Sequence, residues 1–192
     1  HTVRAFDIDT EAFHRFLRSM TMDLTVESYD TWDDLLVYMD GSAAVIGEMM
    51  LPILEPTDYD TALPHARDLG NAFQLTNFLR DIDEDLDRGR QYIPREDSER
   101  FGVDLTQRSV TPEFVGLMRF EIDRCRELYR SAQIGIDMLP DRSAKCVGAA
   151  HALYGRILDK IEAQDYDVFT SRASVSTAEK ATMVAKLLSP FS

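Results

Sequence analysis

Apolar side chains recur along most of this chain at the spacing of an α-helix, and no segment alternates apolar and polar residues as a β-strand would. The first such series consists of Phe13, Phe16, Leu17, Met20 and Leu24. Together, these patterns predict an all-α fold arranged as a single domain over residues 1–192.

Capping residues and helix breakers divide the rest of the chain. The sequence TWDD begins a second helix with a capping-box pattern, and Thr111 followed by Pro112 begins a later one. Two prolines and a polar run separate the second helix from the third, while the charged, glycine-containing stretch of residues 89–110 predicts a long loop. The predicted helices after the first cover residues 31–50, 65–87, 111–139, 143–164 and 176–188.

The charge balance excludes one class of function. With 21 Lys and Arg against 34 Asp and Glu, the net charge of -13 argues against nonspecific binding to nucleic acid, which needs clustered cations. Cys125 and Cys146 lack a CxxC spacing and suggest reduced thiols in the cytoplasm. No uninterrupted apolar run has the length of a membrane-spanning helix. The opening HTVRAFDID resembles neither a signal peptide nor a natural start, so we expect an N-terminal truncation.

The most unusual segment is QLTNFLRDIDEDLDRGR, where a helical turn of about 3.6 residues brings polar side chains onto one stripe. Carboxylates four residues apart on a helix repel each other by roughly 0.2–0.5 kcal/mol, so a cation should compensate them. Oxygen ligands without nearby His or Cys suit Mg²⁺ or Mn²⁺ better than zinc. The alternative is a solvated acidic face with intrahelical ion pairs, and spacing alone leaves both open. The stripe contains Gln74, Asn77, Asp81, Asp85 and Arg88.

Three basic residues near this stripe are candidate partners for phosphate oxygens: Arg80, Arg88 and Arg90. Asp83 and Asp87 fall off the stripe and are interpreted as solvated or supporting residues. The small and apolar residues 43–47 suit either close helix packing or the wall of an apolar cavity. Trp32, Phe13 and Phe16 are interpreted as core residues.

The longer string DLGNAFQLTNFLRDIDEDLDRGRQYIP, residues 68–94, resembles the second aspartate-rich signature of the squalene and phytoene synthase family. That signature reads Q-L-x-N-x-L-R-D-x-x-E-D, followed by R-G-R-x-Y-x-P. Residues 38–54 and 154–176 are similar to two further segments of the family, and the likeness is greatest to bacterial phytoene synthases. The resemblance implies an isoprenoid synthase helical bundle around a central hydrophobic cavity, here the C-terminal two thirds of the enzyme without its N-terminal helices.

The resemblance also implies roles for individual residues. Asp81 and Asp85 would be catalytic and, with Asn77, would hold Mg²⁺ or Mn²⁺ against a substrate diphosphate. The family's first DxxxD motif has no counterpart in this sequence, so we expect this fragment alone to be inactive. Asp40, Ser42 and Ala44 depart from the family pattern, which prevents a transfer of chain-length selectivity. The candidate substrate-binding residues are Tyr38, Gln74, Arg80, Arg88 and Tyr154.

The implied reaction is the head-to-head condensation of two geranylgeranyl diphosphates to phytoene in carotenoid biosynthesis, through a cyclopropylcarbinyl diphosphate and without NADPH. One alternative is a related enzyme that uses C15 farnesyl diphosphate and makes squalene, dehydrosqualene or a hydroxylated product. Another is a noncatalytic helical assembly protein of the same fold. The expected partners are prenyl diphosphates and, because the products are lipids, a membrane surface that the cytoplasmic protein contacts peripherally.

Overall fold

The computed structural model describes residues 1–188 and confirms the all-α prediction. Within these residues the only β-type pairing is an isolated bridge between Ser28 and Gln91. The fold is the helical bundle that the family resemblance predicts. Its elements are α1 (Thr2–Ala5), α2 (Glu11–Met22), α3 (Trp32–Met39), the π-helix η1 (Asp40–Ala44), α4 (Val45–Leu54), α5 (Tyr59–Arg80), α6 (Ile82–Asp87), α7 (Arg95–Phe101), the 3₁₀-helix η2 (Leu105–Gln107), α8 (Pro112–Ile136), α9 (Asp141–Ala163) and α10 (Thr177–Leu188).

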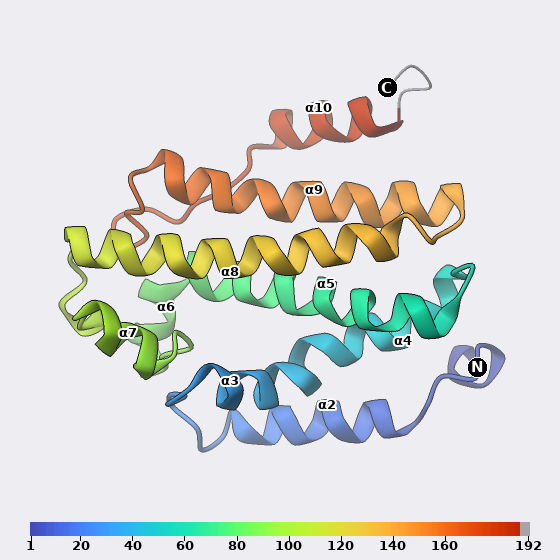
Figure 1. The fold of residues 1–192 in the computed structure, drawn as a ribbon, viewed down its shortest axis with the longest axis horizontal. Coiled ribbons are helices and arrows are strands. Elements are labelled where there is room, and N and C mark those ends of the chain that lie inside the picture. The colour runs from blue at the N-terminus through green and yellow to red at the C-terminus, as the bar shows by residue number, and fades with distance from the viewer. Residues whose placement is uncertain (189–192) are drawn as a thin grey trace.

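The helices lie in successive layers. Figure 1 shows α2 along one edge of the molecule and α10 along the opposite edge, with α5, α8 and α9 between them. The long helix α5 packs most extensively on α8, and on its other side it meets η1 and α4. The fully buried side chains between these helices include Leu35, Met39, Leu75, Leu79, Leu117, Met118, Ile122 and Leu158.

Several predicted helix boundaries were wrong. Helix α5 begins at Tyr59, six residues earlier than predicted, because the Asp58 side chain caps it by accepting from the Thr61 backbone N–H at 3.1 Å. The helix accommodates Pro64 near its start. The stretch of residues 89–110 is not a plain loop, since it contains α7 and η2. Elements of seven and three residues are too short to show a helical period.

The face on which α2 packs was also predicted incorrectly. Phe13 and Leu17 are 38% and 59% exposed, whereas Ala12 and Ser19 are buried. The reason is a close backbone approach, because a Cβ atom added to Gly41 in η1 would lie 2.2 Å from the Arg15 carbonyl oxygen. Small residues therefore form the closest part of the α2 interface, and Phe13 and Leu17 point away from the bundle, while Met22 packs against the core.

The continuous helix Trp32–Leu54 is long and apolar enough to cross a membrane by length and composition, with a mean hydropathy of 1.3. It is also a packed helix of the bundle, because 39% of its most apolar 18-residue stretch is buried. Its acidic residues Asp40 and Glu48 each bind both Arg15 and Arg67, at 2.5 to 2.9 Å. This ring of four charges joins α2 and α5 to the middle of the helix.

Candidate active site

The predicted acidic stripe lies where α5 ends and α6 begins. The helix is interrupted at Asp81, so the prediction of an unbroken helix to residue 87 was wrong. The interruption is local, because Asp81 N–H still donates to the Asn77 carbonyl and Asp85 N–H to the Asp81 carbonyl, each at 2.9 Å. Asn77, Asp81 and Asp85 therefore remain one helical turn apart, as the spacing predicted.

Two guanidinium groups hold the Asp81 carboxylate. Arg80 donates to its two oxygens at 2.7 and 2.6 Å, and Arg172 donates to the same two at 2.8 and 3.1 Å. Burial acts to raise the pKa of Asp81, but the hydrogen bonds from both arginines outweigh it and place this pKa below its ordinary value. Arg172 lies 91 residues further along the chain, in the segment between α9 and α10. Sequence spacing could not have identified it.

Asp85 has much weaker compensation. It is 9% exposed, and its cation contact is with Arg88, whose Nη1 lies 3.4 Å from the Asp85 carboxylate. Arg88 is itself largely exposed and also contacts Glu84 at 3.8 Å. Burial, assisted by the nearby charge of Asp81, raises the pKa of Asp85 to about 6. An added cation would therefore stabilise the charged form of Asp85 more than that of Asp81.

The other acidic residues of the stretch form ordinary ion pairs. Asp83 and Asp87 both bind Arg108, which follows η2. They lie off the Asn77–Asp81–Asp85 stripe, as predicted, and the same segment thus contains both a solvated acidic face and a separate carboxylate pair. Arg108 was not identified from the sequence.

The donor chemistry of the stripe fits a hard divalent cation. Asn77, Asp81 and Asp85 present amide and carboxylate oxygens, the ligands that Mg²⁺ prefers. Across residues 1–188, no group of three or more His, Cys, Asp or Glu side chains is placed to hold a metal. These three residues would supply only part of a coordination shell, and Mg²⁺ commonly fills the remainder with water and substrate phosphate.

Tyr38 lies in an aromatic cluster beneath this region. Its ring is 5.7 Å from that of Tyr92 and 6.4 Å from that of Phe78, which belongs to α5. Burial raises the pKa of Tyr38 above its ordinary value. Arg90 donates to the Tyr92 hydroxyl at 3.2 Å, and it also donates to the Asp23 carbonyl at 2.7 Å. Tyr92 was missed as a site residue, although it is the tyrosine of the R-G-R-x-Y-x-P pattern.

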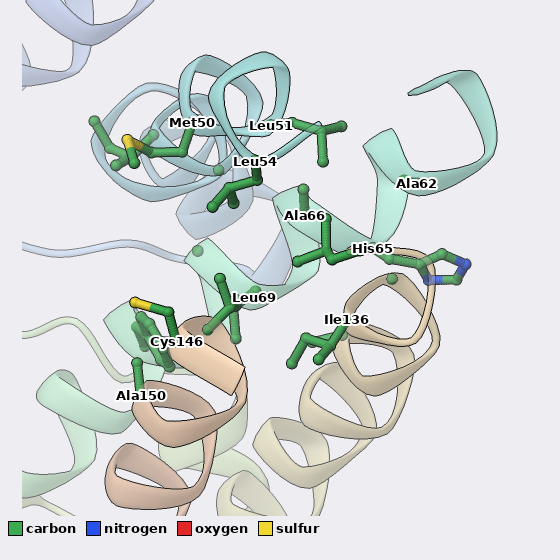
Figure 2. Close-up of a pocket in the computed structure, with 18 residues that line it drawn as sticks. Met50, Leu51, Leu54, Ala62, His65, Ala66, Leu69, Ile136, Cys146 and Ala150 are labelled. Carbon is green, nitrogen blue, oxygen red and sulfur yellow. The ribbon is translucent and has the colours of Figure 1, made fainter. Parts of the chain in front are cut away.

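An apolar cavity of about 270 Å³ lies along the N-terminal part of α5, and Phe73 is its lining residue nearest to the polar end. Figure 2 shows Met50 and Leu54 of α4, Ala66 and Leu69 of α5, and Ala150 of α9 around it. The cavity confirms the hydrophobic pocket implied by the family resemblance. The other lining residues are Ile46, Gly47, Leu51, Ala62, His65, Gly70, Phe73, Ala132, Gly135, Ile136, Leu139, Cys146 and Val147.

The small-residue stretch has both of the roles left open by its composition. Ala43, Ala44 and Val45 are buried in the core, while Ile46 and Gly47 line the cavity. A Cβ atom on Gly47 would lie 2.0 Å from the Ala66 carbonyl oxygen, so this glycine also permits the close approach of α4 and α5.

The remaining candidates lie where the cavity meets the stripe. Phe73 lines the cavity and stacks on Tyr154 of α9, with ring centroids 4.4 Å apart. Gln74 follows Phe73 and is partly exposed, as is Asn77 one turn later. The structure thus brings Gln74, Asn77 and Tyr154 to the same end of α5.

Several characterised proteins resemble this chain in sequence, and solved structures share its arrangement of helices. The Arthrospira platensis protein named phytoene synthase is 37% identical over an alignment of 194 positions, which covers 93% of this chain and 63% of that protein. The Zea mays protein named phytoene synthase 3, chloroplastic, is 38% identical over an alignment of 193 positions, which covers 96% of this chain and 45% of that protein. The crystal structure of the squalene synthase HpnC from Alicyclobacillus acidocaldarius superposes with a TM-score of 0.81 at 30% identity, covering 86% of this chain and 64% of that one.

These matches bear on the extent of the chain as well as on its class. The chain spans about half of the maize relative and less than two thirds of the Arthrospira relative. The profile of the squalene/phytoene synthase family matches residues 1–179. The chain therefore belongs to the squalene/phytoene synthase family.

Proposed function

We propose that the protein is a prenyltransferase that condenses two geranylgeranyl diphosphates head to head to form phytoene in carotenoid biosynthesis. The observation that carries this proposal is the division of α5 into two functional parts. Residues Ala62 to Phe73 line an apolar cavity, and the following turns present Asn77, Asp81 and the guanidinium of Arg80. One helix thus complements both halves of a molecule with an apolar tail and an anionic head.

The polar end has the chemistry to bind a diphosphate. Arg80 and Arg172 present planar donors that suit phosphate oxygens as well as carboxylates, and Arg88 is exposed nearby. Gln74 and Tyr154 would contact the substrate from the cavity side. Bound Mg²⁺ would be held by Asn77, Asp81 and Asp85 and would neutralise charge on the leaving diphosphate.

The apolar end protects the reaction. Loss of diphosphate leaves an allylic cation, which water would capture in an open site. The cavity wall is nearly all hydrocarbon, so it offers few groups that would hold water near the cation while the cation meets the double bond of the second substrate. Phe73 and Tyr38 place aromatic rings at or beneath the polar end, where that cation would form.

The alternative substrate is farnesyl diphosphate, favoured by the likeness to a solved squalene synthase. The full-length protein should be incubated with C15 or C20 prenyl diphosphate and Mg²⁺, with and without NADPH, and the hydrocarbon identified. Phytoene without NADPH is expected. A C15-derived product with no C20 turnover would favour the alternative, and no turnover of either substrate would favour the noncatalytic assembly protein.

Cavity occupancy has a readout that does not depend on turnover. Cys146 is exposed and lines the cavity, whereas Cys125 is buried and burial raises the pKa of its thiol to about 12. A maleimide should therefore label Cys146 selectively. Geranylgeranyl diphosphate should slow this labelling, and a Cys146→Ser variant should abolish it. Undiminished labelling at saturating substrate would place the tail elsewhere.

A further inference from the structure

A second pair of acidic residues lies in the core, away from Asp81 and Asp85. Glu121 of α8 is fully buried, and the side chain of Asp97 in α7 is only 5% exposed. Both carboxylates converge on one nitrogen of Arg124. Its Nη1 lies 2.8 Å from Asp97 and 2.9 and 3.0 Å from the two oxygens of Glu121.

The charges of this cluster do not balance. The Arg124 Nη1 atom has two hydrogens, yet three carboxylate oxygens lie within hydrogen-bond distance of it. The faces of the guanidinium meet the rings of Trp32 at 4.3 Å and Phe120 at 4.6 Å. Two carboxylates and one guanidinium would leave a net negative charge in a site that excludes water.

The neighbouring helices bring few other charges to this site. Helix α3 contributes the Trp32 ring, and α8 contributes the Cys125 thiol beside Glu121. Arg100 of α7 lies over the Phe120 ring, with its guanidinium carbon 4.8 Å from the ring centroid. Burial, with a further contribution from Asp97 and against the opposing effect of Arg124, raises the pKa of Glu121 to about 8.

Helix α7 anchors the segment that borders the candidate active site. Residues 88–94 connect α6 to α7, and Arg90 N–H in this segment donates to the Asp85 carbonyl at 2.8 Å. At the α7 end, Arg95 N–H donates to the Tyr29 carbonyl at 3.0 Å, and Glu96 accepts from Trp32 N–H at 2.6 Å. The position of α7 thus contributes to how residues 88–94 lie against Asp85, together with the Gln91 N–H, which donates to the Glu27 carbonyl at 2.8 Å.

We propose that Asp97 and Glu121 share one proton, and that this proton holds α7 on α8 and thereby positions residues 88–94 beside Asp85. Release of the proton puts two full negative charges next to each other against a single guanidinium. Their repulsion loosens α7, and the segment that α7 anchors becomes more mobile. Asp97 and Glu121 are positioning residues, and the cluster makes the geometry of the site depend on pH.

The chain contains its own reporter for this proton. Trp32 is the single tryptophan and stacks on Arg124. Its emission should change in a one-proton transition between about pH 6 and about pH 10, while circular dichroism shows that the helices persist. Glu121→Gln should remove the transition. Glu127→Gln, an exposed glutamate on the same helix, should keep it.

A second readout tests positioning. Amide hydrogen exchange in residues 88–101, corrected for the intrinsic effect of pH, should increase about tenfold above the transition in the parent and stay low in Glu121→Gln. Asp97→Asn provides the same test should Glu121→Gln fail to fold. A flat Trp32 emission in the parent, or an unchanged transition in a folded variant, would overturn the shared proton. An unchanged exchange rate would overturn the positioning role.

Discussion

Two pairs of carboxylates lie within this fold, and their surroundings give them different properties. At the α5–α6 junction, Arg80 and Arg172 both bind Asp81, and Asp85 is left with the distant Arg88. In the core, a single arginine serves two buried carboxylates. Of the cations around the first pair, Arg80 is 13% exposed, but Arg172 and Arg88 are 51% and 63% exposed and could exchange a carboxylate for a ligand. Both carboxylates of the second pair are nearly or fully buried. Similar acidic groups can thus form a binding site or a structural anchor, depending on access.

The largest effect should come from removing the first pair. Asp81→Ala or Asp85→Ala in the full-length enzyme should reduce turnover by at least about 10²-fold, because each removes charge stabilisation at the diphosphate. The helical circular dichroism signal should persist. Asp83→Ala is the matched control on the same short helix, since Asp83 binds Arg108 instead. Near-parental turnover in both Asp81 and Asp85 variants would refute the assignment.

The next effect concerns the second pair. Arg124→Gln should lower the free energy of unfolding by about 3–5 kcal/mol at neutral pH, because it leaves the one negative charge of the buried Asp97–Glu121 pair without its cation. Urea denaturation measures this loss. Combining the change with Asp97→Asn should recover part of it, since the unpaired charge is then removed. A loss below about 1 kcal/mol would mean that water reaches the cluster.

The core pair of carboxylates should also make the free energy of unfolding depend on pH. The pKa of Glu121 in the folded protein is raised to about 8 from an ordinary value of 4.5. The folded state therefore holds the proton more tightly, and this stabilisation is complete below about pH 4.5 and is lost as the pH rises through about 8. The slope should reach up to about 1.4 kcal/mol for each pH unit. In urea titrations Glu121→Gln should flatten the curve, and Glu127→Gln should leave it unchanged.

Local sequence signals predicted the long helices well, because each has an apolar period and several, such as α3 and α8, begin with a capping residue. They failed where a distant contact decides the outcome. Phe13 and Leu17 of α2 face outward because Gly41 in η1 lets the backbone of that helix approach closely at the Arg15 carbonyl. Amphipathic spacing identifies a helix and its two faces, but not which face a neighbouring backbone will contact.

In the candidate site, too, local spacing predicted some residues and missed those that distant contacts bring together. Gln74, Asn77, Asp81 and Asp85 are related by helical spacing, so a single segment of sequence was sufficient to group them. Arg172 reaches Asp81 from the segment after α9, and no local pattern links them. Asp97 and Glu121 belong to different helices, and their shared arginine becomes visible only when α7 packs on α8. Contacts between elements require the fold.

The smallest effect compares the two arginines directly. Arg172→Gln should change the free energy of unfolding by less than about 1 kcal/mol, because the Arg172 side chain is 51% exposed and Asp81 keeps its bidentate contact with Arg80. Arg172 and Arg124 each make short hydrogen bonds to carboxylates, so counting contacts would predict similar losses. The same urea measurement on both variants decides between contact number and burial. Equal losses would break the comparison, since the Asp81 pair would then be as enclosed as the core pair and less available to a ligand.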